Sequence, residues 1–446
     1  MSRCVLLYNP ISYRGHLDSW TGIFAHNLLR RGHEVLLLTQ NAAIVDRGEM
    51  PGGERLTLLP WTRDIRPWHV RSFSRARDYL REFLKRHGGG SPAGDPEQDI
   101  SSLARKRRAF FRKITPPLYS LTGSLFPRFF HPDKGDAVPF DPPRSAAIRI
   151  ARALHGTTRK PDLIIHLYLD MYDMTEDAWA RYESVCPTPW VGVRFDPPAD
   201  PCRDGFCRIG SCRGAFFLDE GAAQRYAAYF GDKHISFLSD VTDTRLPTSP
   251  TVFETEVRRK SAGRKIVFMG GTIGGQKDLA TWYELIRTAS KGRFYFLQVG
   301  EVIEGTLSIE DRAAYDAVIK DPPENFFCLS GFLPDEAEFN ALIRASDIIY
   351  AVYRDFRLSS NMLAKAACFE KPILVSGRYV MGERVRRYSL GLTVAEGDVD
   401  GIAEALDVLA TRPGTSYGFA KYRSDFSEER FADALDSCVK HCLDRG

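Results

Sequence analysis

The sequence predicts an α/β protein made of two doubly wound, Rossmann-like lobes of parallel strands. Short apolar runs alternate with stretches whose apolar residues recur at helical spacing, which is the pattern of strands joined by crossover helices. The alternation appears in residues 1–245 and starts afresh in residues 262–425. A chain of 446 residues is long enough for about two to three domains.

The composition favours a globular protein of a reducing compartment. The net charge of +4 is too small to indicate nucleic acid binding by itself. Nine cysteines at uneven spacing do not form a disulfide framework. The N-terminal residues lack a secretory signal pattern, and no run approaches the ~18 apolar residues of a membrane span. We therefore expect a cytoplasmic protein, with peripheral membrane contact left open.

The first lobe opens with a strand over residues 3–8, a polar loop, a helix over 20–31 and a second strand over 35–38. In parallel sheets, ligands bind at the carboxyl ends of the strands. The loop that contains Gly15 and His16 lies at that edge, so both residues are candidates for an acceptor-side site. The loop lacks the G-x-G-x-x-G pattern, so no nicotinamide cofactor is indicated.

An insertion over residues 61–132 interrupts the first lobe. Its second half, residues 105–130, carries seven Lys or Arg residues, six aromatic residues and no Asp or Glu. Basic and aromatic residues together favour contact with an anionic membrane surface. A solvated helix that packs its aromatic residues on the core explains the same pattern. Nucleic acid uses these residue types too, but is the least favoured partner.

Two carboxylates follow predicted strands of the first lobe. Asp196 follows the strand over residues 189–193 and is our catalytic candidate, with Asp170, after the strand over 163–167, as the second. An ordinary loop cap or ion pair is the alternative for each. Cys202, Cys207 and Cys212 follow at five-residue spacing. Cysteines are common ligands of zinc. Zinc usually takes four ligands with closely spaced pairs, so no metal site is predicted.

The second lobe begins after a polar linker over residues 244–263. The strand over residues 265–269 leads into a loop with Gly270, Gly271 and Lys277. Glycines let backbone N–H groups approach a phosphate, and a lysine adds a positive charge. The loop is not a P-loop, which requires a G-K-[ST] sequence.

Residues 353–376 are the segment around which we expect the second lobe to be organised. Ser359, Ser360 and Asn361 precede a predicted helix that begins at Met362. A capped helix start offers free N–H groups and a favourable dipole to an anion. We therefore expect this turn to hold the diphosphate of a nucleotide-linked substrate, with an ordinary capped helix as the alternative. Residues 426–446 contain a last helix, which we expect to pack back on the first lobe.

Seven segments, in order along nearly the whole chain, resemble the family 4-like glycosyltransferases of the GT-B fold. They are RRGHEVLLLT (30–39), PDLIIH (161–166), PTPWVGVRFD (187–196), FLSDVTDT (237–244), IVFMGG (266–271), LSGFLP (329–334) and SSNMLAKAACFEKPILVS (359–376). The resemblance implies two Rossmann-like domains that face a central cleft. It implies transfer of a sugar from a nucleotide-diphosphate sugar, such as a UDP or GDP sugar, to a glycan, glycolipid or lipid-linked acceptor.

The resemblance also implies a donor site without a metal or other cofactor. Its residues would be Gly270, Gly271, Lys277, Arg357, Ser359, Ser360, Asn361, Met362 and Lys365. Several positions depart from the family pattern. Gly271 replaces the usual arginine, Arg357 and Lys365 replace two glutamates, and Phe195 replaces the catalytic-loop histidine beside Asp196. A catalytically silent nucleotide-sugar-binding or partner protein is therefore the alternative function.

Overall fold

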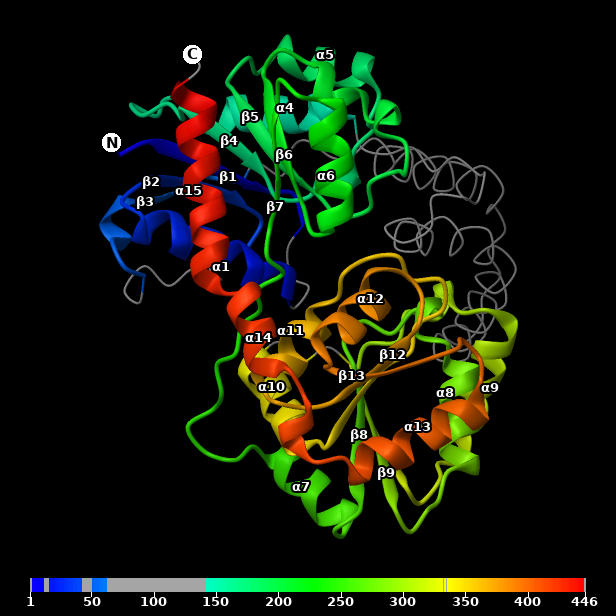
Figure 1. Cartoon of the computed structure of the whole chain (residues 1–446). Helices are drawn as coiled ribbons and strands as arrows, with labels where there is room; N and C mark the ends of the chain where they lie inside the picture. The colour runs from blue at the N-terminus through cyan, green and yellow to red at the C-terminus, as the bar shows by residue number, and fades with distance from the viewer. Residues whose placement is uncertain are drawn as a thin grey trace, which may run out of the picture.

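The computed structural model describes residues 2–11, 16–41, 50–61, 142–331, 333 and 335–444, except for the side chains of residues 16–18. They form two lobes, shown one above the other in Figure 1. Each lobe is built on one parallel sheet, with seven strands in the first and six in the second. The predicted α/β class with two doubly wound lobes is confirmed.

The first sheet has the strand order β3-β2-β1-β4-β5-β6-β7. Its central strand pairs in parallel on both sides, with Val5 opposite Val35 on one neighbour and opposite Leu163 on the other. The strands are β1 (Cys4–Asn9), β2 (Glu34–Thr39), β3 (Leu56–Leu58), β4 (Leu163–His166), β5 (Trp190–Arg194), β6 (Cys212–Phe217) and β7 (His234–Phe237).

The second sheet has the strand order β10-β9-β8-β11-β12-β13. Its order also reverses beside the first strand of the lobe, because β9 lies on one side of β8 and β11 on the other. The strands are β8 (Lys265–Gly270), β9 (Phe294–Gly300), β10 (Phe326–Ser330), β11 (Ile348–Ala351), β12 (Ile373–Ser376) and β13 (Gly391–Val394). Ligands bind at such reversal points in open parallel sheets.

Both faces of each sheet are buried, which explains the continuous apolar runs in the sequence. In β1, Val5 and Leu7 pack into one core cluster, while Leu6 and Tyr8 point into the cluster on the opposite face. The helices that cover the first sheet are α1 (His16–Arg30), α4 (Pro143–Leu154), α5 (Glu176–Glu183), α6 (Glu220–Tyr229) and α15 (Glu428–Asp444).

The second lobe carries eight of the helices in the described residues. They are α7 (Val252–Ser261), α8 (Leu279–Thr288), α9 (Ile309–Lys320), α10 (Glu336–Ala345), α11 (Asn361–Cys368), α12 (Tyr379–Tyr388), α13 (Val399–Thr411) and α14 (Phe419–Asp425). Short polar side chains cap the N-termini of several of these helices. Thr251, for example, accepts a hydrogen bond from the backbone N–H of Glu254 and caps α7.

The last helix returns to the first lobe. In Figure 1, α14 lies in the lower lobe and α15 runs along the upper one. The guanidinium of Arg30 lies 2.7 Å from a carboxylate oxygen of Glu429, and His33 lies 3.1 Å from Asp436. Phe431 also packs on Phe24 of α1, with ring centroids 4.9 Å apart. Ion pairs and aromatic packing therefore hold α15 on the first lobe.

The structure differs from the sequence-based expectation in the linker. Residues 244–263 were expected to be a linker, but Val252–Ser261 form α7. The residues of this helix are mostly polar because it buries only Glu254, Val257 and Ser261. The basic segment 105–130 lies outside the described residues. In the described ranges, no helix is both long and apolar enough to cross a membrane.

Candidate functional site

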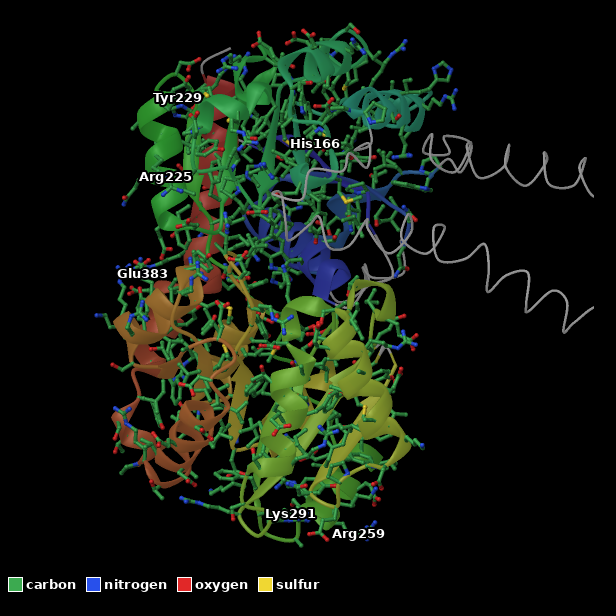
Figure 2. All side chains as sticks on the ribbon, turned by 90° about the vertical axis from the view of Figure 1, so that its right-hand side faces the viewer. His166, Arg225, Tyr229, Arg259, Lys291 and Glu383 are labelled. Carbon is green, nitrogen blue, oxygen red and sulfur yellow. The ribbon has the colours of Figure 1, made fainter. Side chains whose placement is uncertain are left out.

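The carboxyl ends of the second sheet face the first lobe. Figure 2 shows Arg259 and Lys291, which precede β8 and β9, at the end of the molecule farthest from the first lobe. Glu383 of α12 lies at the level where the lobes meet. The strands therefore run towards the first lobe, and the loops that follow them gather at the lobe boundary.

The loop after β8 is shaped by glycines. Gly271 has a φ angle of 94°, and Gly300, at the end of β9, has one of 135°. A Cβ atom on Gly300 would lie 2.0 Å from the carbonyl oxygen of Gly271, so this close approach requires glycine. A Cβ atom on Gly271 would meet no heavy atom of the described residues within 4 Å. The backbone of this loop is therefore open to a ligand.

Lys277 lies where the loop after β8 meets the loop after β11. Its Nζ donates to the carbonyl oxygen of Gly270 at 3.0 Å and to the hydroxyl of Tyr353 at 2.7 Å. The ammonium also lies 3.9 Å from the centroid of the Tyr353 ring. An ammonium has three N–H groups, so these two bonds leave one for a phosphate oxygen. The topology thus brings Gly270 and Lys277 together with the segment 353–376.

A partly buried ion-pair network holds this loop in place. The guanidinium of Arg354 pairs with Asp278 and, at 3.2 Å, with Asp311. Its backbone N–H also donates to the carbonyl oxygen of Gln276 at 2.8 Å. Burial disfavours the charged guanidinium, but the two carboxylates outweigh burial and raise the pKa of Arg354. We did not predict Arg354 as a site residue, because its partners are distant in sequence.

The two serines before α11 have different partners. The hydroxyl of Ser360 accepts a hydrogen bond from the backbone N–H of Met362 at 3.3 Å, so Ser360 is the N-cap that the sequence predicts. The hydroxyl of Ser359 donates to Asp240 at 2.5 Å and accepts from Arg384 at 2.8 Å. Ser360 therefore caps α11, which starts at Asn361, while Ser359 connects the loop to the segment after β7.

Arg384 of α12 extends this connection to the first lobe. Its side chain is only 2% exposed, and its guanidinium donates to Glu220 at 2.7 Å and to the carbonyl oxygen of Leu218. Arg384 could not be recognised from the sequence, because Leu218 and Glu220 lie in the other lobe. Together, Ser359 and Arg384 hold the start of α11 against the first lobe.

Lys365 is engaged inside the protein. It is fully buried, pairs with Glu336 at 2.7 Å, and donates to Asn340 and to the carbonyl oxygen of Asp243. These three partners account for its three N–H groups. By contrast, Arg357 is exposed, with its guanidinium 5.6 Å from the centroid of the Tyr379 ring. Its guanidinium also lies 3.9 Å from the carboxylate of Asp355, so Arg357 is engaged at the surface, whereas Lys365 is enclosed.

In the first lobe, Asp170 organises the loop after β5. Its carboxylate accepts hydrogen bonds at 2.8 Å from the backbone N–H groups of Phe195 and Asp196 and pairs with Arg194. Arg194 also donates to Asp204 at 3.1 Å. Burial opposes the charge of Arg194, but the two carboxylates outweigh it and raise its pKa. Asp170 therefore fixes the backbone that presents Asp196, which is half-buried.

Phe195, which stands where the family that the sequence resembles has a histidine, packs among aromatic rings. Its ring stacks on Tyr168 at a centroid distance of 5.4 Å and lies 5.4 Å from the Trp20 ring. This position therefore contributes apolar packing and has no titratable group. Gly15 lies outside the described residues. His16 begins α1, but its side chain is not described.

Cys202, Cys207 and Cys212 are not placed as a metal centre. Cys202 is exposed, while Cys207 and Cys212 are buried. Across the part of the chain that the structure describes, no group of three or more His, Cys, Asp or Glu residues is placed to hold a metal ion.

Comparison with known proteins gives matches in structure alone. No family model and no curated protein matches the sequence. A glycosyltransferase from Rickettsia africae is similar at a TM-score of 0.60 and 10% identity, with 100% of both chains covered. HepE from Anabaena, solved with UDP and glucose, is similar at 0.59 and 12% identity over 98% of this chain and 100% of that one.

A third similar structure is sucrose-phosphate synthase from Thermosynechococcus elongatus, with a TM-score of 0.59, 11% identity and 100% coverage of both chains. At such low identity, the likeness shows the fold, which is the GT-B arrangement that the sequence resemblance implied. The chain therefore has the architecture of proteins that transfer sugars, with its glycine loop, Lys277 and the α11 start at the boundary between the lobes.

Proposed function

We propose that this chain is a family 4-like glycosyltransferase. It would move a sugar from a nucleotide-diphosphate sugar, bound mainly to residues 262–425, to an acceptor bound mainly to residues 1–245. The GT-B fold and the UDP and glucose bound to HepE support this proposal. The observation that carries it is the position of Lys277 beside the segment that leads to α11, at the edge that faces the other lobe.

The donor site would act on the charge of the diphosphate. Lys277, the first N–H groups of α11 and the exposed Arg357 supply positive charge, and the backbone of Gly270 and Gly271 is open to a close approach. The departing diphosphate gains negative charge in the transition state, so donors already held in place stabilise it. Fixed cations and a helix start perform this task in our scheme, which therefore requires no metal or other cofactor.

Acceptor chemistry would take place in the cleft between the lobes, near Asp196. Asp170 holds the backbone N–H of Asp196 and keeps this loop in one conformation. Asp196 would act as a general base in an inverting reaction, or orient the acceptor in a retaining one. Gly15 and His16, the candidates from the sequence, would complete the acceptor side.

We propose a glycan, glycolipid or lipid-linked intermediate as the acceptor, met on the cytoplasmic side of a membrane. The basic and aromatic segment 105–130 supports this proposal, because anionic lipid surfaces attract such segments by about 1 kcal/mol per Lys or Arg. Nucleic acid is not part of the proposal, since the net charge of the whole chain is only +4.

A catalytically silent nucleotide-sugar-binding or partner protein is the second candidate. Three observations favour it: Phe195 packs among aromatic rings, Lys365 is saturated by internal partners, and Gly271 leaves open space where the family has an arginine. In this case the donor site would bind a nucleotide without turnover.

Calorimetry with UDP and GDP, followed by a donor-hydrolysis assay, separates the two candidates. Nucleotide binding together with release of nucleoside diphosphate from a sugar donor supports the transferase. Binding without turnover, across several sugars and lipid extracts, supports the silent protein. If neither nucleotide binds, the transferase that uses a UDP or GDP sugar and the silent nucleotide-sugar-binding protein are both contradicted, which leaves the partner protein.

A further inference from the structure

A small pocket lies away from the proposed donor site, where the last turn of α15 packs on β6 and on the residues before β7. Its volume is about 70 Å³. The side chains that line it are mostly cationic or sulfur-containing: Cys212, Arg213, Asp232, Lys233, His441 and Cys442. Neither the sugar-transfer proposal nor the fold comparison gives this pocket a role.

One member of a buried cysteine pair lines the pocket. The sulfur atoms of Cys438 and Cys442, one helical turn apart in α15, lie 3.7 Å from each other. Both cysteines belong to the core cluster of the first lobe, with Cys438 1% and Cys442 3% exposed, but of the two only Cys442 lines the pocket. A small reagent in the pocket therefore meets Cys442 first, with Cys438 directly behind it.

The pKa values of the two thiols shift in opposite directions. The hydrogen bond from Cys438 lowers the pKa of Cys442 against the effect of burial, and the positive charge of Arg213 lowers it further. Burial raises the pKa of Cys438. Thiolates are the nucleophilic form of cysteine, and a neighbouring cation favours them. Its lower pKa and its place on the pocket make Cys442 the nucleophile of the pair, with Cys438 as its hydrogen-bond partner.

The other charged groups around the pocket are largely engaged. Lys233 donates to the carbonyl oxygen of Cys212 at 3.0 Å and lies 3.5 Å from Asp232. The ring of His441 packs against that of His234, with centroids 4.8 Å apart. Arg213 differs, because its buried Nε has no hydrogen-bond partner among the described residues. Arg213 is therefore the cation most available to a thiolate, and it offsets the negative end of the α15 dipole.

We propose that Cys442 and Cys438 are a modification site, where a hydroperoxide converts the two thiols into a reversible disulfide. The Cys442 thiolate attacks the peroxide, so an S–O bond forms, the O–O bond breaks and hydroxide leaves. That hydroxide takes the proton of Cys438. The Cys438 thiolate then attacks the Cys442 sulfur and displaces hydroxide, which takes up the proton that Cys442 released to solvent when it became a thiolate. In total, two thiols and one hydrogen peroxide give one disulfide and two waters.

The helix makes this disulfide strained and easy to reduce. Side chains four residues apart in a helix have Cβ atoms about 5–6 Å apart, whereas a disulfide needs about 3.5–4.5 Å. The turn must therefore tighten. Because α15 ends at Asp444, two residues beyond Cys442, this happens in its last turn. A strained disulfide has a higher reduction potential, so ordinary thiols should reverse it.

Peptide mapping of the full, reduced protein tests the proposal. The protein is treated with about one equivalent of hydrogen peroxide, free thiols are blocked, and trypsin is added. Trypsin cuts after Lys440, between the two cysteines, so the disulfide joins peptides 431–440 and 441–445. We expect this linked pair, lacking two hydrogen atoms, to form before other cysteine products and to disappear with dithiothreitol.

Cys202 is the internal control. It is exposed, but its hydrogen bond with Asp200 raises its pKa, so it should react more slowly than the pair. Oxidation of Cys202 while Cys438 and Cys442 stay reduced would overturn the proposal. This readout uses the unaltered chain and does not depend on how a variant folds.

Variants assign the roles of the individual groups. Cys438→Ala should leave Cys442 as a sulfenic acid that dimedone captures, and Cys442→Ala should leave Cys438 unmodified. Arg213→Gln should slow oxidation about three- to tenfold, since one pKa unit changes the thiolate fraction about tenfold, while Arg213→Lys should retain most of the rate. Dimedone capture at Cys438, or an unchanged rate in Arg213→Gln, would contradict the assigned roles.

Discussion

Replacement of Lys277 by alanine tests the proposed phosphate site. The change removes one positive charge at the junction of the loops after β8 and β11. It also removes the hydrogen bonds to the carbonyl oxygen of Gly270 and the hydroxyl of Tyr353. Because the ammonium is held by both partners before a ligand arrives, little of its binding energy is lost in ordering the side chain.

The expected loss follows from one charge-assisted hydrogen bond to a phosphate oxygen. Such bonds contribute about 1.5–3 kcal/mol, and each 1.4 kcal/mol changes affinity about tenfold. Lys277 is half-buried, so solvent screens it only in part. Lys277→Ala should therefore weaken the binding of UDP or GDP by about tenfold to a hundredfold.

Isothermal titration calorimetry measures this change, with thermal unfolding as the check on folding. Tyr353→Phe is the matched control, because it removes one acceptor of the ammonium but keeps the aromatic ring and the charge. We expect less than about a threefold loss of affinity in this variant. Unchanged nucleotide affinity in a folded Lys277→Ala protein would refute the phosphate site.

Four further changes have defined outcomes. Gly271→Arg should tighten nucleotide binding. It should also lower the unfolding free energy by about 1–2 kcal/mol, because the φ angle of residue 271 is 94°. Gly271→Ala should lower the unfolding free energy in the same way without tightening nucleotide binding. Lys365→Met should lower the unfolding free energy by about 3 kcal/mol, because it leaves Glu336 unpaired, but should hardly change the nucleotide affinity of the folded protein. Burial lowers the pKa of His166 from 6.5 to about 3. Between these pH values, the unfolded chain therefore binds a proton that the folded chain does not. Urea unfolding should therefore show about 2 kcal/mol less stability from this group at pH 5 than at pH 7, and His166→Gln should remove the difference. Deletion of residues 105–130 should abolish sedimentation with anionic liposomes, and unchanged sedimentation would remove the membrane proposal.

The strands could be predicted because both faces of each sheet are buried. A strand such as β1 (Cys4–Asn9) buries side chains on both faces, so Val5 to Tyr8 form an unbroken apolar run in the sequence. The start of α12 carried no such signal. It begins at Tyr379, which has a φ of 56°, and no side chain caps it. Helix α7 was hidden in the expected linker because it buries few apolar residues.

The sequence also placed Lys277 and the α11 cap at one edge, since the carboxyl ends of parallel strands meet there. The sequence did not reveal the hydrogen-bond and ion-pair partners of Lys365 and Arg384. The sequence made Lys365 a donor-site candidate, but its partners Glu336 and Asp243 come from another helix and from the segment between the lobes. Arg384 gave no signal, because Leu218 and Glu220 belong to the other lobe. Such contacts join residues that are distant in sequence, so the residue pattern of one segment does not reveal them.

A structure of the full chain with a nucleoside diphosphate bound tests the central claim most directly. We predict that the diphosphate binds between the ammonium of Lys277 and the first N–H groups of α11, at the edge that faces the first lobe. A diphosphate bound elsewhere, or an empty edge at a saturating nucleotide concentration, would contradict it.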